Sequence, residues 1–465
     1  MADADVITDE TLTLRNVRID GEFFAALTSN EGDLVCTLDG CDLSAYVQAV
    51  GYHVNVDTHK QLIVRKCHFH DSGLHSQRAA LIYVSPGVAI NVSDSRFSAS
   101  HRFGVYINGA TTVRPLYSLI INNVFEETLA QAIQVSKNNR PLIWRNLIKT
   151  YFGGIAFFGS YRGAEVLENV VVQAGEPAEG WHFISGGVEG GRGHVRAQGN
   201  SVETGAEKGK GWVFSSAAIT LTGDGAVWDV DDNLFVLNHA KVFGIQSNIA
   251  SNVLAFVSRN RFMGLGGEHH VCMGFNGGTL YAKGNAVETE SGYAFSFLDD
   301  ALVMARLEDN DVAASVTPLY VSLAEGSAGK ISGSGNNFPG DYARINWMKD
   351  FKYQMITPRE GACPTAVASA ANTRLPMSYD TVHISGNVPI NNFYYYHHQD
   401  SDAGVTRLFC GRVRVIFDDE GATVTGGGNI EPGTTGPRVA GRVYRFVLDP
   451  RTARWYEYQD APSPA

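Results

Sequence analysis

Charge is scarce in this chain of 465 residues. Only 18% of the residues are charged, and they leave a formal net charge of −11. Without a basic stripe, the chain has no means of neutralising the phosphates of a nucleic acid, and it offers no polybasic face to anionic lipids. We therefore expect neither nucleic acid nor a membrane surface as a partner.

Long apolar runs and closely spaced cysteines are also missing. No stretch approaches the ~20 consecutive apolar residues of a membrane-spanning helix. The first residues contain no basic segment followed by an apolar run, so we expect no Sec-type signal peptide. The six cysteines lie far apart and form no CxxC pair, which favours buried, reduced thiols.

Glycine, by contrast, is abundant, with 50 residues. Many glycines together with little charge suit a protein of strands and turns better than a helical one. The chain is too long for one ordinary compact core, so we expect either several domains or one array of repeats.

One tripeptide recurs along the chain: Asn, any residue, then a bulky apolar residue. Its nine copies begin at Asn123, Asn146, Asn169, Asn200, Asn233, Asn260, Asn285, Asn310 and Asn336. Four weaker copies precede them, beginning at Val17, Cys41, Cys67 and Ser95. The nine copies are 23 to 33 residues apart. Irregular spacing around a fixed local pattern is typical of a solenoid whose loops vary in length.

The recurring Asn has a physical reason in a solenoid of parallel strands. Coils stack at ~4.8 Å, so an inward-pointing Asn can bond to its equivalents in the coils above and below. A buried amide without such partners costs roughly 1–3 kcal/mol. Asn also tolerates the left-handed backbone that a sharp bend needs. We predict an Asn ladder; Cys41 and Cys67 would share its column, which leaves a disulfide between them open.

Short segments that alternate between apolar and other residues predict one further strand in each coil. The alternation predicts an inward column of Val54, Ile82, Val105, Ile133 and Ile155. The same alternation predicts an outward column of Asn55, Tyr83, Tyr106, Gln134 and Ala156.

The repeated coil pattern ends towards the C-terminus. Parallel coils are expected over residues 1–345, and a segment rich in Pro and Ala over 346–371 is expected to be a transition or cap. Residues 372–465 are expected to form a small antiparallel β module. Its alternating strands are predicted over 380–386, 405–409, 412–417, 422–425, 442–448 and 454–458.

The nine Asn tripeptides resemble those of right-handed parallel β-helices of the pectate-lyase-like superfamily, which includes phage tailspikes. The resemblance covers residues 120–340 well and 12–120 more weakly, and it implies an all-β fold of about 12–13 coils. The segments 384–386, 411–417, 423–430, 444–448 and 455–457 are similar to a terminal module common in phage tail and prophage proteins. These resemblances imply a virion or prophage origin and a homotrimer.

Loops between the Asn turn and the outward column are the expected site, because the β-helix proteins that this chain resembles bind glycans along one long face. These loops contain the candidate catalytic residues Asp71, His75, His101, Arg102, Glu126 and Glu127. A glycoside hydrolase needs two carboxylates ~5–9.5 Å apart, which favours Glu126 or Glu127 with Asp71. A lyase needs a general base and a cation, for which His75 or His101 with Arg102 is the alternative. Each residue alone is better explained as a solvated loop residue, and only the clustering across adjacent coils favours a site.

Aromatic and amide side chains supply the candidate contacts to sugars. They are Asn55, Tyr83, Tyr106, Gln134, Trp181 and Trp212. His68 and His70 would share one face of a strand, but the sequence identifies no third ligand beside them, so we expect neither a metal nor another cofactor.

Three functions stay open. The chain can be a phage or prophage tailspike-like protein that binds, or binds and depolymerises, a bacterial surface polysaccharide. It can also be a non-catalytic receptor-binding or structural virion fibre, or a free-standing polysaccharide lyase or epimerase. The expected partners are the polysaccharide, further copies of the chain and other phage tail or baseplate proteins. The expected location is the virion, after synthesis in the host cytoplasm.

Overall fold

The computed structural model divides into two compact units, Met1–Gly274 and Phe275–Ala465. The described residues are 4–8, 11–20, 25–29, 35–44, 48–52, 60–72, 80–84, 86–100, 103–109, 116–137, 139–151, 153–158, 163–173, 182–186, 193–204, 217–238, 242–247, 252–266, 270–322, 330–337, 343–345, 356–362, 366–375, 379–394, 412–433, 436–449 and 454–458. The predicted boundaries at residues 345 and 371 are separate from this division and stay predictions.

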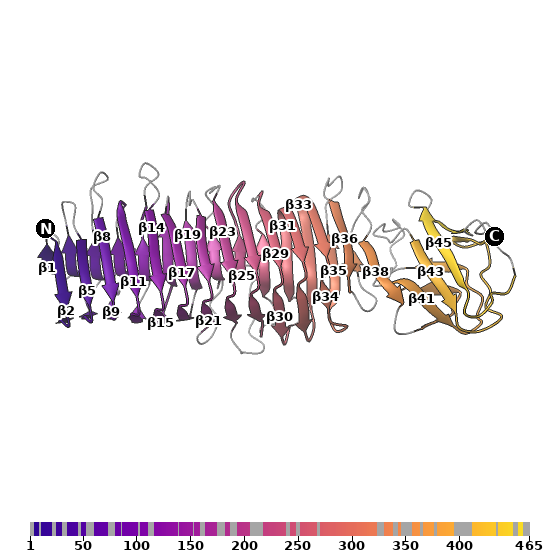
Figure 1. The fold of residues 1–465 in the computed structure, drawn as a ribbon, viewed down its shortest axis with the longest axis horizontal. Coiled ribbons are helices and arrows are strands. Elements are labelled where there is room, and N and C mark those ends of the chain that lie inside the picture. The colour runs from indigo at the N-terminus through magenta and orange to yellow at the C-terminus, as the bar shows by residue number, and fades with distance from the viewer. Residues whose placement is uncertain are drawn as a thin grey trace, which may run out of the picture. The chain divides into compact units, whose positions relative to one another are not determined.

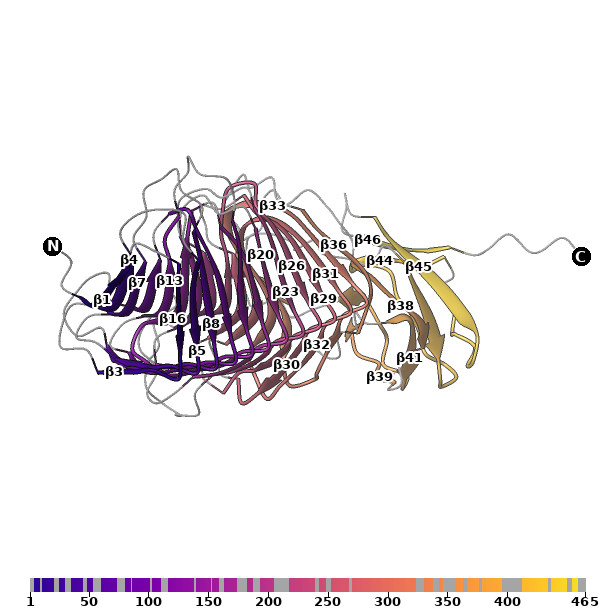
Figure 2. The same ribbon diagram turned by 60° about the vertical axis from the view of Figure 1, so that its left-hand side comes forward.

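The first unit consists of coils of three short strands each. Its described residues contain thirty strands, β1 to β30, in ten successive triplets. Equivalent strands of neighbouring coils pair in parallel, and in the first unit these pairings run in three columns, here called sheets 1 to 3. Figure 1 shows strands β5, β8 and β11 side by side, and Figure 2 shows β23, β26 and β29 in the same way. The predicted solenoid of parallel β coils is confirmed.

Each sheet takes one strand from every coil. Sheet 1 contains β1 (Ala4–Thr8), β4 (Ala25–Ser29), β7 (Gln48–Tyr52), β10 (Ala80–Val84), β13 (Phe103–Ile107), β16 (Gln131–Ser136), β19 (Gly153–Phe158), β22 (His182–Gly186), β25 (Ala217–Leu221) and β28 (Phe243–Ser247). Sheet 2 contains β2 (Leu12–Arg15), β5 (Val35–Asp39), β8 (Lys60–Arg65), β11 (Val88–Ser93), β14 (Leu116–Ile121), β17 (Asn139–Trp144), β20 (Gly163–Leu167), β23 (His194–Gln198), β26 (Val227–Asp231) and β29 (Leu254–Ser258). Sheet 3 contains β3 (Arg18–Asp20), β6 (Asp42–Ser44), β9 (His68–Ser72), β12 (Arg96–Ser100), β15 (Val124–Thr128), β18 (Leu147–Thr150), β21 (Val170–Gln173), β24 (Ser201–Glu203), β27 (Leu234–Val236) and β30 (Arg261–Gly264).

The Asn ladder is present in both units. All nine Asn side chains are at most 2% exposed. In the first unit each Nδ2 donates to the Oδ1 of the next Asn at 2.9–3.0 Å, from Asn123 to Asn260. In the second unit Asn285 donates to Asn310 at 2.9 Å, and Asn310 donates to Asn336 at 2.8 Å. The buried amides therefore satisfy one another, as predicted.

The weaker copies continue the same column with other polar atoms. The backbone N–H of Cys41 donates to the Cys67 Sγ at 3.3 Å, and that of Cys67 donates to the Ser95 Oγ at 3.1 Å. Ser95 in turn donates its N–H to the Asn123 Oδ1 at 3.0 Å. Cys41 and Cys67 are free thiols in the structure.

The left-handed residue of each turn lies one position before the ladder Asn. In the first unit these residues have φ between 51° and 66°, and they are Asn16, Gly40, Lys66, Asp94, Asn122, Arg145, Glu168, Gly199, Asp232 and Arg259. The ladder Asn residues themselves have no positive φ. The proposal that Asn recurs because it tolerates this conformation is therefore wrong; its hydrogen bonds explain it.

The predicted columns of sheet 1 hold from β10 onward. Ile82 pairs with Val105 and Tyr83 with Tyr106, and the register continues in β16 and β19. One coil earlier, however, Ile82 pairs with Val50 rather than with Val54. The expected register at 54 and 55 is wrong by four residues, because loop lengths differ between coils.

The second unit begins with further parallel pairs. β31 (Val271–Lys283) crosses the division between the units. The 16-residue strand β33 (Tyr293–Glu308) pairs by its first half with β35 (Thr317–Ser322) and by its second half with β36 (Lys330–Asn336). The other parallel pairs are β32 (Ala286–Thr289) with β34 (Asp311–Val312), β35 with β37 (Ala343–Ile345), and β36 with β38 (Ile356–Ala362).

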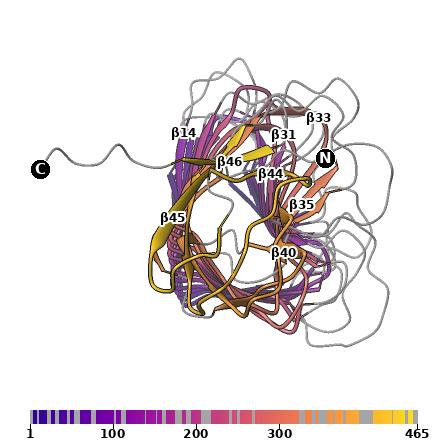
Figure 3. The same cartoon turned by 90° about the vertical axis from the view of Figure 1, so that its right-hand side faces the viewer.

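The expected C-terminal β module is present, with mixed pairing. Its antiparallel part, among the described strands, is β43 (Arg412–Phe417), β45 (Val443–Asp449) and β46 (Arg454–Tyr458). Its parallel pairs are β38 with β41 (Tyr379–Ser385), β39 (Val367–Ala368) with β41, β40 (Asn372–Arg374) with β42 (Asn392–Tyr394), β41 with β43, and β44 (Ile430–Glu431) with β46. Figure 3 shows β44 beside β46.

Two of the six strands predicted for this module have a different outcome. The prediction over 422–425 is wrong in extent, because only an isolated bridge joins Val424 to Ile390 there. The segment 405–409 lies outside the described residues. In the part of the chain that the structure describes, no helix has the length and apolarity that crossing a membrane requires.

Candidate functional site

Glu126 lies on β15, on the outer face of sheet 3, and joins three neighbouring coils. The Arg96 Nη2 is 2.7 Å from one of its carboxylate oxygens, and the Lys149 Nζ is 3.7 Å from the other. The Glu126 side chain is 24% exposed. The carboxylate is thus accessible, but two cations hold it in place.

Asp71 and Glu127 occupy irregular positions in sheet 3. Both have left-handed backbone, with φ of 51° and 57°, and the register between β15 and β18 shifts next to Glu127. The strand of Asp71 lies two coils from that of Glu126, because β9 pairs with β12 and β12 pairs with β15. Two coil steps separate the backbones by about 10 Å. Their role as an acid/base pair stays a prediction.

The predicted column of Tyr83, Tyr106 and Gln134 is in register across three coils. Tyr83 is only 4% exposed, and the Asn108 Nδ2 donates a hydrogen bond to its hydroxyl at 3.1 Å. Tyr106 and Gln134 are half-buried, and the Tyr106 ring packs edge-on against Tyr83 at 5.2 Å. Tyr83 therefore packs beneath the surface, whereas the side chains of Tyr106 and Gln134 are partly exposed to solvent.

Half of the predicted site residues fall where the structure gives no description. These are Asn55, His75, His101, Arg102, Trp181 and Trp212. Their proposed roles stay predictions. In sheet 1, Gly51 occupies the position beside Tyr83 at which Asn55 was expected.

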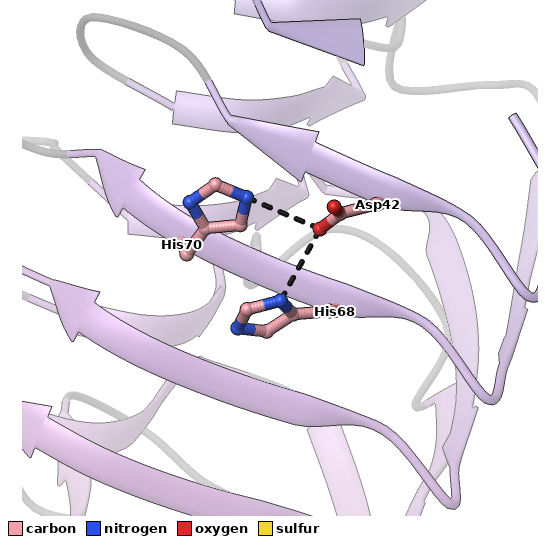
Figure 4. Close-up of side chains that lie close together, drawn as sticks. All are labelled: Asp42, His68 and His70. Carbon is pink, nitrogen blue, oxygen red and sulfur yellow. Dashed lines mark ion pairs between the residues drawn. The ribbon is translucent and has the colours of Figure 1, made fainter. Parts of the chain in front are cut away.

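A cluster that the sequence reading missed lies on the outer face of sheet 3. Asp42 on β6 lies beside His68 and His70 on β9 (Figure 4). The Asp42 Oδ1 is 3.2 Å from the His68 Nδ1 and 3.1 Å from the His70 Nε2. The two imidazole rings stack with their centroids 4.6 Å apart. The register Cys41–Cys67 already placed Asp42 beside His68, so the sequence did contain the signal.

Each imidazole of this cluster has a second polar contact on its other nitrogen. The Asp71 Oδ2 is 2.7 Å from the His70 Nδ1, and the Ser98 Oγ is 2.9 Å from the His68 Nε2. Burial lowers the pKa of the His68 imidazole, and neighbouring His70 lowers it further. The arrangement can therefore hold both rings in fixed orientations, and it favours the neutral form of His68.

The outer face of sheet 2 carries aromatic and charged side chains in register, of which Tyr117 is exposed and Trp144 is half-buried. Tyr117 on β14 is 68% exposed and pairs with Arg140 on β17, whose Nη1 donates to the tyrosine hydroxyl at 3.4 Å. On the same strand, Trp144 packs under the Arg145 guanidinium at 4.4 Å. Hydrogen bonds from Arg145, and then from Trp144, lower the pKa of Glu168. The sequence reading did not single out this surface, because no single motif marks it.

Comparison with known proteins supports the fold. A family model described as "Right handed beta helix region" matches residues 6–171. Together with the parallel coils, this match supports a right-handed parallel β-helix as the fold of the first unit. No curated protein matches the chain.

Proposed function

We propose that this protein binds a bacterial surface polysaccharide along the outer face of its β-helix, as a tailspike-like protein of a phage or prophage. The observation that carries the proposal is the row of aromatic and charged side chains on neighbouring coils of sheet 2, with Tyr117 exposed and Trp144 half-buried. Tyr117 and Trp144 supply the rings, and Arg140, Arg145 and Glu168 surround them. The β-helix fold, which is common among proteins that bind or degrade polysaccharides, supports the same reading.

The chemistry of this row suits a sugar chain. The apolar face of a sugar ring stacks on an aromatic side chain, and its hydroxyl groups bond to charged groups around the ring. Coils that repeat at ~4.8 Å present such groups at regular intervals. An extended glycan can therefore contact several coils at once, and many weak contacts add up to specific binding.

Assembly and location belong to the same proposal. A homotrimer attached to a virion, with other tail or baseplate proteins as partners, would present several copies of the glycan-binding face to one cell. Simultaneous engagement raises the overall avidity without any new contact. Light scattering of the purified chain tests the trimer, and a monomeric mass would contradict it.

Binding is tested with purified capsular polysaccharide and lipopolysaccharide from candidate hosts, by titration calorimetry. We expect Tyr117→Ala to weaken binding about tenfold, the effect of losing ~1.4 kcal/mol of ring contact. The matched control is Tyr456→Ala, which removes a tyrosine of the second unit that is 41% exposed. Equal affinities of the two variants would contradict the assignment of this face.

Depolymerisation is tested on the same glycans by looking for shortened or unsaturated products. If the chain cleaves its ligand, the double variant Glu126→Gln/Glu127→Gln is expected to abolish cleavage while retaining binding at Tyr117. Unchanged product formation would show that Glu126 and Glu127 are not the catalytic residues. Binding without any product would favour the non-catalytic fibre.

A further inference from the structure

The cluster of Asp42, His68 and His70 has the composition and spacing of a metal site. We propose that these three side chains bind one divalent transition-metal ion of the zinc class. Zinc accepts imidazole nitrogens and carboxylate oxygens, at ~2.0–2.2 Å, usually in a tetrahedron. One ligand atom from each of the three side chains lies within 4.8 Å of the others. The expectation of no metal site rested on a missing third ligand, and Asp42 supplies it.

The distances fit a metal-centred polyhedron. Bonds of ~2.0–2.2 Å give a tetrahedron with edges of about 3.3–3.6 Å. The Asp42 Oδ1 lies 3.2 Å from the His68 Nδ1 and 3.1 Å from the His70 Nε2, close to two such edges. Figure 4 shows both rings directed at this one oxygen. Shifts of a few tenths of an ångström in these side chains would therefore accommodate an ion without rearranging the strands.

The hydrogen bond between His70 and Asp71 also supports a metal site. A carboxylate only accepts, so the 2.7 Å contact to Asp71 makes the His70 Nδ1 the donor. The Nε2 is then the nitrogen that faces the Asp42 Oδ1, at 3.1 Å. This buried oxygen has no well-aligned hydrogen-bond donor among the described residues. A cation placed between this oxygen and the His70 Nε2 would be bound by both atoms.

The surroundings resemble those that orient metal ligands in proteins. A ligating histidine usually donates its other N–H to a carboxylate or a neutral oxygen, which fixes the tautomer and the ring orientation. Asp71 does this for His70, and Ser98 contacts the second nitrogen of His68. Three protein ligands leave a fourth tetrahedral position open for water or for an oxygen of a bound molecule. The site is independent of the proposed glycan contacts at Tyr117.

The competing arrangement is an imidazolium at His70 that donates to both carboxylates. Zinc titration separates the two arrangements. The full-length chain, free of any affinity tag and stripped with a chelator, is titrated with zinc chloride by calorimetry. We expect one ion per chain at this site, and at least tenfold weaker binding in His70→Gln and in Asp42→Asn.

The matched control is His194→Gln. His194 forms a comparable surface pair with Asp229, at 2.5 Å, but it has no third ligand beside it among the described residues. This variant should bind zinc as the unaltered chain does. Equal zinc binding by His70→Gln and the unaltered chain would overturn the proposal, as would the absence of binding by the folded unaltered chain.

Cobalt substitution provides a readout that does not depend on the variants. A four-coordinate Co²⁺ ion bound by nitrogen and oxygen gives intense visible absorption, whereas hexahydrated Co²⁺ absorbs weakly. We expect the intense band on adding one equivalent of Co²⁺, and its displacement by zinc. A spectrum that stays that of the hydrated ion would also overturn the proposal.

Discussion

Asn169 accepts two hydrogen bonds from Asn146, from the backbone N–H at 2.9 Å and from the Nδ2 at 3.0 Å. It also donates from its own Nδ2 to the Ile143 carbonyl and to the Asn200 Oδ1, both at 3.0 Å. One side chain therefore connects three consecutive coils and satisfies polar groups that have no access to water. The same arrangement explains why Asn recurs where other residues of similar size do not.

Replacing Asn169 by Ala is expected to destabilise the first unit by about 2–4 kcal/mol, because buried donors and acceptors lose their partners. Denaturant unfolding followed by circular dichroism measures the change. The control Asn252→Ala removes an exposed amide and should alter the free energy of unfolding by less than about 0.5 kcal/mol. Similar values for both variants would contradict the role of the ladder.

The coils were predictable because their signal is local. Each Asn, with the apolar residue two positions later, marks one bend, and the buried column from Phe69 through Phe97 to Phe125 follows the same count. The left-handed residue before each ladder position carries only a partial signal, because Asn, Asp and Gly, which favour this conformation, stand at six of the ten such positions of the first unit. Lys66 and Arg145 occupy two of the other positions, although neither residue type favours that conformation. The surrounding ladder imposes it instead.

The sites were less predictable because they depend on register between coils. Asp42 lies 26 residues before His68, and only the paired turns bring them together. A loop of different length displaced the expected column at Asn55 in the same way. The contacts of Glu126 with Arg96 and Lys149 also join residues of different coils. A search for motifs along the chain does not detect such neighbours, because they are far apart in the sequence.

A buried ion pair is expected to stabilise the C-terminal module. The Arg438 Nη1 and Nη2 donate to the two carboxylate oxygens of Glu457 at 2.7 and 2.8 Å, and both side chains are at most 2% exposed. Arg438→Met leaves the Glu457 charge without this partner and should cost about 3–5 kcal/mol. Thermal unfolding measures the loss.

The double variant Arg438→Met/Glu457→Gln provides the control for this pair. It removes both charges, so it should recover much of the stability lost in Arg438→Met. A double variant no more stable than Arg438→Met would show that packing of the Arg438 side chain over Tyr444, rather than the unpaired charge, dominates.

Cys67 is expected to resist alkylation in the folded chain. Burial raises the pKa of its thiol to about 12, and its Sγ contacts the Arg65 carbonyl at 3.2 Å. Only the thiolate reacts, so at pH 8 the thiolate fraction alone should slow iodoacetamide labelling about a thousandfold relative to an unperturbed cysteine. Peptide mass spectrometry before and after unfolding in guanidinium measures the rate, and the same peptides would reveal a disulfide to Cys41. Rapid labelling of the native chain would contradict the burial.

His182 should make the stability of the first unit depend on pH. Burial lowers the pKa of its imidazole to about 4, whereas the unfolded chain takes up this proton near pH 6.5. Between these values the unfolded state binds more protons, so stability is complete above about pH 6.5 and falls as the pH drops towards 4. The total loss is roughly 3 kcal/mol. Denaturant midpoints over this range measure it.

His182→Gln isolates this contribution, because glutamine keeps a polar partner for the Thr220 hydroxyl, which lies 2.9 Å from the His182 Nδ1. The variant cannot take up the proton, so its stability should fall less steeply than that of the unaltered chain between pH 6.5 and 4. His194→Gln replaces an exposed imidazole in the next strand along the chain. The stability of this variant should depend on pH more steeply than that of His182→Gln. If the slope is the same in His182→Gln and in the unaltered chain, carboxylates rather than His182 determine the acid sensitivity of this unit.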